Sequence, residues 1–321
     1  MLMQENNEKD YPPINVIIRG EKAKFIAINK KLVYDKRDGI KSLLNENELM
    51  VLIGLYLLNG YRDETLIITP KEIYNQLTCM VYQESEKRLM KLIIEGLEGI
   101  INKGVVSVLN GLVSGDKIRM NSDIHLNVTK LLRKDKEAFI ALDKREINRI
   151  MQCNRTADSS LSRPKLIALF VAIIDSISVH EVSVSFGTRY DYLSEYEGIV
   201  CFKSIMKLAS IVGASTSSIQ IYLDKLEAMK LIYIHRFEGH VFKNGKIKRL
   251  NNWYGRYQFK NEIKQLAVIK NKQLNFRQSE VCDEQIDNET KGLSRVIAHD
   301  RPRGLAIAPP YDRLNRPKPV F

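Results

Sequence analysis

The chain has 321 residues, of which 44% are hydrophobic and 27% are charged. These proportions are typical of a globular protein and exclude a disordered, collagen-like or disulfide-dense chain. Lysine and arginine number 50 against 38 aspartates and glutamates, which gives a net charge of +12. This excess favours a polyanionic partner, and nucleic acid is preferred to a membrane because the sequence holds no run of about 18 apolar residues.

The sequence gives no sign of secretion, metal binding or catalysis. Its start is polar and acidic, with Glu5, Glu8 and Asp10, and lacks the basic and apolar regions of a signal peptide, so we expect a cytoplasmic protein. The four cysteines and five histidines are widely separated, whereas zinc ligands occur in close pairs. Phosphate-binding glycine loops and the GxSxG motif are also missing. We therefore expect that the protein binds no metal or other cofactor and that it is not an enzyme.

Residues 1–23 are expected to be an N-terminal arm, and residues 24–135 the first folded domain. Apolar periodicity, an N-cap before a proline at Thr69-Pro70 and turn residues after position 109 define its elements. The first is a strand at Phe25–Lys31. Three helices follow: one at Glu46–Leu58, a short one that begins at Thr69-Pro70, and one at Ser85–Asn102. The last element is a hairpin formed by Val105–Leu109 and Lys117–Met120.

The same order recurs in residues 136–265, the second expected domain. Its first segment, Phe139–Arg145, repeats Phe25–Lys31 after 114 positions, with four of seven residues identical. The elements expected after it are helices at Leu161–Ser176, Lys203–Ser210 and Thr216–Lys230, a strand at Leu231–Phe237, a hairpin tip at Asn244-Gly245 and a returning strand at Trp253–Phe259. The repeat predicts a duplicated unit whose two first strands are equivalent.

Helix, helix, turn, helix and β-hairpin is the winged-helix order, and it is found twice. The segment Phe202–Ile232 resembles bacterial winged-helix regulators along its whole length. Gly213 suits the tight turn, and Ser215 is placed to cap the helix that follows. The expected fold is mainly α with small β-hairpins (α+β): two tandem winged-helix domains, then a linker and flexible basic tail over 266–321.

The helix after Ser215 is expected to enter the major groove of DNA. Ile219, Leu223 and Leu226 anchor it to the core by their spacing. Hydroxyl and amide groups on the other face suit phosphates and base edges, and a helix N-terminus favours phosphate. The predicted DNA-binding residues here are Thr216, Ser217, Ser218, Gln220, Ile221 and Lys225.

The hairpin of the second unit carries much of the positive charge. Between His235 and Lys264 there are eight basic residues against Glu238 and Glu262, a net charge of +6. Because a wing approaches the DNA backbone, this charge predicts phosphate contacts. The predicted contacts are Arg236, Lys243, Lys246, Lys248 and Arg249, and the other three basic residues are Arg256, Lys260 and Lys264.

The third helix of the first unit is a weaker candidate. It presents Lys87, Arg88 and Lys91 as predicted DNA contacts, but Glu84 and Glu86 lie at its start. Carboxylates there stabilise the helix and repel phosphate. Three roles stay open for this unit: weak DNA binding, recognition of a different half-site, or dimerisation.

The two units together, over roughly residues 24–265, resemble plasmid replication initiators built from tandem winged-helix domains. The resemblance implies binding of double-stranded DNA at repeated sites in a plasmid or phage origin and contacts with host replication proteins. A homodimer is a separate expectation for the oligomeric state. The alternatives are a winged-helix transcriptional regulator and a primosome-type adaptor whose winged helices bind proteins. The tail adds seven basic residues against two acidic ones over Lys291–Phe321, and is either a basic arm or only a solvated tail.

Overall fold

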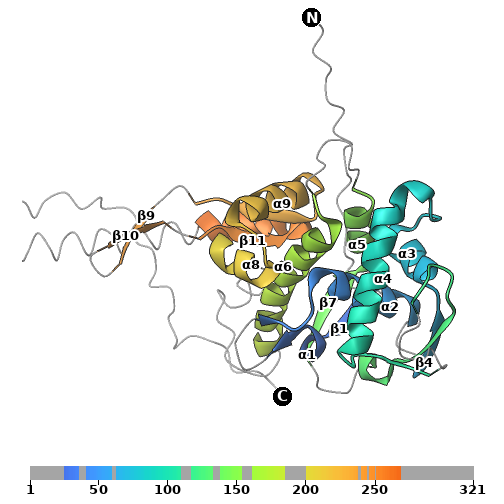
Figure 1. Ribbon diagram of the computed structural model, residues 1–321. Helices are drawn as coiled ribbons and strands as arrows, with labels where there is room; N and C mark the ends of the chain where they lie inside the picture. The colour runs from blue at the N-terminus through green and yellow to red at the C-terminus, as the bar shows by residue number, and fades with distance from the viewer. Residues whose placement is uncertain are drawn as a thin grey trace, which may run out of the picture. The chain divides into compact units, whose positions relative to one another are not determined.

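The computed structural model describes residues 25–35, 41–59, 63–109, 117–132, 138–153, 161–184, 200–237, 240–243, 246–249 and 251–268. The N-terminal arm and the linker and tail beyond 268 lie outside the described residues. The described part is mainly helical, with five small antiparallel sheets among its residues, in agreement with an α+β fold (Figure 1).

The two copies of the repeated segment pair with each other. Strand β1 (Phe25–Asn29) runs antiparallel to β7 (Phe139–Asp143), with Ala27 opposite Ala141 at the centre. The strands are equivalent elements, as predicted, but their pairing was not predicted. Each leads directly into a short helix, α1 (Lys30–Val33) or α5 (Lys144–Met151). An antiparallel pair of equivalent strands has a local twofold axis at its centre, so the repeat is reflected in the pairing.

The caps of α1 and α5 are also equivalent. The Asn29 side chain accepts a hydrogen bond from the N–H of Lys31 at 3.0 Å, and the Asp143 side chain accepts one from the N–H of Arg145 at 2.8 Å. Asn and Asp are favoured N-caps because their oxygen satisfies an N–H that the helix itself leaves unpaired. The similarity therefore extends from the sequence to the local hydrogen bonding.

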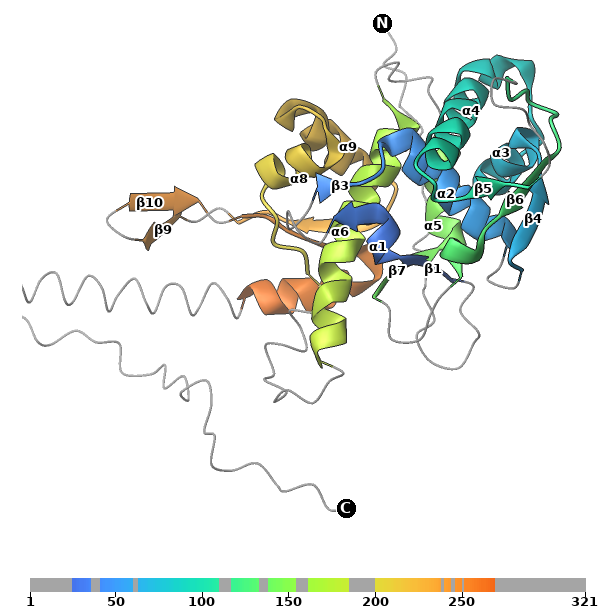
Figure 2. The ribbon, with the colours of Figure 1, turned by 60° about the horizontal axis from the view of Figure 1, so that its bottom comes forward.

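The first unit has helices beside a three-stranded sheet (Figure 2). The sheet has the order β4-β6-β5, so the strand before the second helix lies beside the last strand. A capping box at Thr69 starts α3, as expected from Thr69-Pro70. The elements are β2 (Tyr34–Asp35), β3 (Lys41–Ser42), α2 (Glu46–Asn59), β4 (Thr65–Ile68), α3 (Pro70–Thr78), η1 (Glu84–Glu86), α4 (Lys87–Asn102), β5 (Ser107–Val108), β6 (Ile124–Asn127) and η2 (Thr129–Leu131).

The returning strand of the first unit is β6, so the strand expected at Lys117–Met120 is wrong. Ile124 and Leu126 are fully buried and pair with Ile68 and Leu66 of β4. Residues 117–120 instead pass the start of α3, where the Met120 carbonyl accepts a hydrogen bond from the N–H of Lys71 at 3.3 Å. Both segments alternate apolar and polar residues, and only the partner strand decides which of them joins the sheet.

The second unit repeats this arrangement. Strand β11 pairs with β8, and its Tyr254 also forms a bridge with Cys201, just before the second helix. The last strand thus again lies between the other two. The elements are α6 (Arg163–Val184), α8 (Ile205–Val212), α9 (Thr216–Ala228), β8 (Ile232–His235), β9 (His240–Lys243), β10 (Lys246–Arg249), β11 (Trp253–Arg256) and η4 (Tyr257–Phe259).

Two expectations at the end of the second unit are corrected. The returning strand stops at Arg256, because η4 and a helix at residues 260–268 follow it. This helix crosses the domain boundary expected at residue 266, and Leu266 and Ala267 are buried on it. The helix packs beside Trp253 in a small second core, so it belongs to the folded unit.

One hydrophobic core runs through both units. Val51 of α2 and Phe170 of α6 are fully buried members of it, and the two helices pack against each other. Gly96 of α4 allows close packing on α2, since a Cβ there would lie 2.5 Å from the carbonyl oxygen of Asn47. An ion pair also connects the two units: Lys30 Nζ lies 2.8 Å from Asp175 Oδ1 of α6.

Helix α5 joins the two units through hydrogen bonds to helix ends. Asn148 Nδ2 donates to the carbonyls of Gln76 and Leu77 at 3.0 and 2.7 Å, at the end of α3. On the other side, an Arg149 guanidinium N–H donates to the carbonyl of Met229 at 3.1 Å, at the end of α9. Terminal helix carbonyls lack partners inside the helix, so α5 satisfies those of one helix in each unit.

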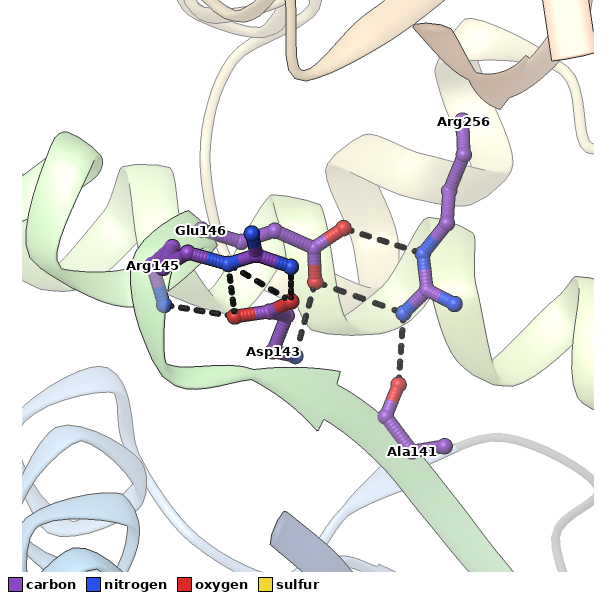
Figure 3. Close-up of polar contacts among 5 residues, drawn as sticks. All are labelled: Ala141, Asp143, Arg145, Glu146 and Arg256. Atoms are coloured by element: carbon purple, nitrogen blue, oxygen red, sulfur yellow. Dashed lines mark hydrogen bonds and ion pairs between the residues drawn. The ribbon is translucent and has the colours of Figure 1, made fainter. Parts of the chain in front are cut away.

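A buried ion pair completes this junction (Figure 3). Arg256 of β11 lies 3.0 Å from Glu146 of α5, and its guanidinium also donates to the carbonyl of Ala141 at 2.6 Å. Burial raises the pKa of Glu146, although Arg256 acts to lower it. Arg256 was counted among the basic residues of the wing segment, and the structure instead places it in this junction.

Candidate nucleic-acid interface

Short polar residues and a glycine shape the turn between α8 and α9. Ser204 caps α8 by accepting from the N–H of Lys207 at 3.2 Å. Gly213 ends α8 with φ at 65°, a left-handed conformation that glycine adopts without strain. Ser215 then caps α9 by accepting from the N–H of Ser218 at 3.1 Å. The roles expected of Gly213 and Ser215 are confirmed.

Helix α9 has one buried and one accessible face. Ile219, Leu223 and Leu226 are fully buried, as their spacing predicts, and Tyr222 is buried with them. The residues of this helix that were predicted to contact DNA are all accessible: Thr216, Ser217 and Ile221 are exposed, and Ser218, Gln220 and Lys225 are half-buried. The surface needed for groove contact is therefore present.

Three serine hydroxyls gather at the start of α9. Ser215 Oγ lies 3.0 Å from Ser217 Oγ and 2.8 Å from Ser218 Oγ. A hydroxyl both donates and accepts, so each can exchange such a contact for one with a phosphate oxygen. The first N–H groups and the positive end of a helix also favour an anion here. This end of α9 has the chemistry for a phosphate contact.

A chain of polar contacts connects α9 with the end of β8. Gln220 Nε2 donates to Asp224 Oδ1 at 2.9 Å, and the Arg236 guanidinium donates to the same oxygen at 3.0 Å. Arg236 also donates to Glu227 Oε2 at 2.8 Å, while Glu227 Oε1 accepts from the N–H of Ile234 at 3.0 Å. The predicted phosphate contact Arg236 is thus already joined to two carboxylates of α9.

Strands β9 and β10 form the hairpin expected on either side of Asn244-Gly245. Their register puts Lys243 opposite Lys246, and Arg249 opposite His240. Lys248, the fourth predicted contact in the hairpin, pairs with Val241. The backbone therefore brings the four predicted basic residues into one short hairpin. Its tip and the side chains of both strands lie outside the described residues.

The remaining basic residues of this segment are engaged with the protein itself. Lys260 Nζ lies 5.3 Å from the ring centre of Tyr257, and Lys264 Nζ lies 5.9 Å from that of Tyr233. Ammonium groups over aromatic rings are attracted by the ring face. With Arg256 in the junction and Arg236 at the end of β8, four of the eight basic residues lie outside the hairpin, so the charge of the segment is less concentrated there than expected.

In the first unit, α4 presents its predicted basic residues beside acidic ones. Lys87 Nζ lies 2.7 Å from Glu84 and Lys91 Nζ lies 3.7 Å from Glu95, and all four side chains are largely exposed. Arg88 is exposed as well. Such exposed pairs add little stability, but the carboxylates offset the positive charge that a phosphate would meet.

The start of α4 has two features that the sequence did not reveal. Glu86 forms a bidentate ion pair with Arg163 of α6: two guanidinium nitrogens donate to its two carboxylate oxygens at 2.9 and 3.2 Å. The charge of Glu86 is therefore balanced by a residue of the second unit. Met80 and Val81, in the turn before α4, are 52% and 75% exposed. This surface is more apolar and more acidic than the start of α9.

Other kinds of site receive no support from the part of the chain that the structure describes. No group of three or more His, Cys, Asp and Glu side chains in it is arranged to hold a metal ion. None of its helices combines the length and apolar character needed to cross a membrane. Comparison with models of known families, with curated proteins and with solved structures finds no match for this chain.

Proposed function

We propose that the chain is a sequence-specific double-stranded DNA-binding protein built from two winged-helix units. Both units have a long helix, a strand position and two further helices, in that order, and strands follow: β5 and β6 in the first unit, and β8 to β11 in the second. In both, the last strand lies between the strand position before the second helix and the first strand after the third helix. This agreement in chain order and in strand order supports the winged-helix assignment, since neither was imposed by the repeat of seven residues alone.

The observation that carries the proposal is the surface of α9. A capped helix presents hydroxyls at its start and an amide, Gln220, in its first turns, and the hairpin that follows in the chain contains Lys243 and Lys246. In a winged-helix domain the third helix lies in the major groove and the wing reaches the backbone. Base contacts then come from α9 and phosphate contacts from the hairpin.

Substitution of Gln220 by alanine tests the role of α9. An amide can pair with adenine N6 and N7, a contact that is worth roughly 1–3 kcal/mol of discrimination. We expect Gln220→Ala to lower the preference for a selected duplex over a scrambled one, measured by competitive gel shift at one salt concentration. Lys91→Ala on α4 is the matched control and should cost less. Loss of specificity in Lys91→Ala alone would assign base recognition to the first unit.

We further propose that the chain initiates replication of a plasmid or phage by binding repeated origin sites. The resemblance to tandem winged-helix initiators and the joining of two units through β1 and β7 support this role. A transcriptional regulator would use the same surfaces on an operator. A marker plasmid without another origin should be maintained when it carries this gene with its flanking DNA; loss of that plasmid would favour the regulator.

A protein-binding adaptor is the second candidate, and the turn before α4 favours it. The exposed apolar side chains of Met80 and Val81 stand beside Glu84, a combination suited to a protein partner rather than to phosphate. For the first unit, contact with a host replication protein or with a second copy is therefore the alternative to DNA contact. Met80→Ser/Val81→Ser should then weaken that association and leave DNA affinity unchanged.

A further inference from the structure

Gln220 is held by a neighbour on its own helix. Its Nε2 atom donates to Asp224 Oδ1 at 2.9 Å, across one helical turn. Residues four apart in a helix lie on the same face, so both groups belong to the surface that faces DNA in the proposed function. The Asp224 side chain is 54% exposed, which leaves this contact at the surface.

The contact determines which way the amide of Gln220 points. An ionised carboxylate only accepts hydrogen bonds, so it must face the NH₂ group of the amide and not its oxygen. One N–H of Gln220 is then used, while the second N–H and Oε1 remain for a base. Adenine offers N7 as an acceptor and N6 as a donor in the major groove, which is the complementary pair.

Arg236 keeps Asp224 in place. Its guanidinium donates to the same oxygen, Oδ1, at 3.0 Å and is held in turn by Glu227 at 2.8 Å. A hydrogen bond between a guanidinium and a carboxylate is stronger than one between neutral groups, so it holds the Asp224 side chain firmly. Arg236 also balances negative charge that would otherwise face the phosphates. Arg236, at the end of β8, is therefore bonded to two carboxylates of α9 and is not an unpaired cation available to a phosphate.

From these contacts we infer that Asp224 is a positioning residue that fixes the amide of Gln220 for adenine and so helps to set base preference. The inference deepens the proposed function and rests on it. Asp224→Asn is the direct test, because an asparagine can donate as well as accept and no longer fixes the orientation of the Gln220 amide. Glu227→Gln is the matched control: it removes one negative charge from the same helix and contacts Arg236, but not Gln220.

The experiment selects duplexes with a randomised core using the full chain, at one salt concentration. We expect the wild type to require adenine at one position, and Asp224→Asn to lose roughly 5- to 150-fold of that preference. Glu227→Gln should retain it, while both variants gain affinity for all duplexes because each loses a negative charge. If Asp224→Asn selects the same base as strongly as Glu227→Gln does, the inference is overturned and the proposed function stands.

A second measurement needs no DNA. In the wild type, the side-chain N–H proton of Gln220 that donates to Asp224 should lie downfield of its position in a glutamine without such a contact. This proton should move upfield in Asp224→Asn and keep its shift in Glu227→Gln, in folded samples with unchanged backbone spectra. The same shift of this proton in the wild type and in Asp224→Asn would overturn the inference. Selection of no sequence by the wild type would overturn the proposed function, and with it the role of Asp224 in base preference.

Discussion

His235 lies among aromatic side chains at the end of β8. Its ring centre is 4.6 Å from that of Phe237 and 6.4 Å from that of Trp253. Burial, and then the ammonium of Lys264, lower the pKa of His235 below its ordinary value. Between that lowered pKa and the unfolded value near 6.5, the unfolded chain binds more protons than the folded chain. This residue therefore makes the fold less stable as the pH falls below about 6.5.

Replacement of His235 isolates this effect. We expect the melting temperature of the wild type to fall more than that of His235→Gln when the pH is lowered from about 7.5 to about 5.5, since glutamine does not titrate. Thermal unfolding at both pH values measures the difference. Lys264→Gln is a companion variant, because removal of its ammonium should reduce the fall partly. Equal losses in the wild type and in His235→Gln would refute this assignment.

At the scale of single elements, the sequence predicts helices better than strands. The start of α9 and its buried face follow from the cap and the spacing, with Ser215 at the start and Ile219, Leu223 and Leu226 inward, whereas α8 begins and ends two residues later than expected. Those signals lie within one helix, so no other part of the chain is needed to interpret them. Strand β6 was missed because Lys117–Met120 has the same alternation, and the choice depends on β4, more than fifty residues away.

The candidate site divides in the same way. The accessible face of α9 follows from its periodicity, and its predicted residues are accessible in the structure. The contact of Arg236 with Asp224 and Glu227 depends on how β8 packs beside α9, which composition does not encode. The count of basic residues likewise included Arg256 in the wing segment. In the structure Arg256 pairs with Glu146, which lies 110 positions away in the sequence. Charge counts identify the segment but not the neighbours of each residue.

The hairpin β9–β10 carries a prediction about salt. Neutralising Lys243, Lys246, Lys248 and Arg249 should weaken binding to all duplexes and lower the slope of log affinity against log salt by about 0.9 for each phosphate that is no longer neutralised. Binding isotherms over a range of salt concentrations measure this slope. Neutralising Lys260 and Lys264, which lie over tyrosine rings, should change it less. An unchanged slope in the hairpin variant would show that the hairpin does not approach the DNA backbone.

At the scale of the whole folded part, the two units share more than a connecting peptide. Their first strands pair, their long helices α2 and α6 pack together, and α5 bonds to the ends of α3 and α9. A core that is continuous across both units makes their unfolding cooperative, because neither unit retains its buried surface without the other. We therefore expect residues 25–268 to unfold in one transition.

The pair of Glu146 and Arg256 tests how far this cooperation depends on the junction. The Glu146 and Arg256 side chains are only 3% and 18% exposed, so removing one partner leaves a buried charge without its counter-ion. We expect Glu146→Leu or Arg256→Met alone to lower the free energy of unfolding by roughly 3–5 kcal/mol. The double variant should lose less than either single one, since no unpaired charge is left. Denaturant unfolding followed by circular dichroism and by Trp253 fluorescence gives all four values. Additive losses would contradict a direct coupling, and separation of the two signals in Arg256→Met would show that one cooperative transition needs the contact of α5 with β11 inside the second unit.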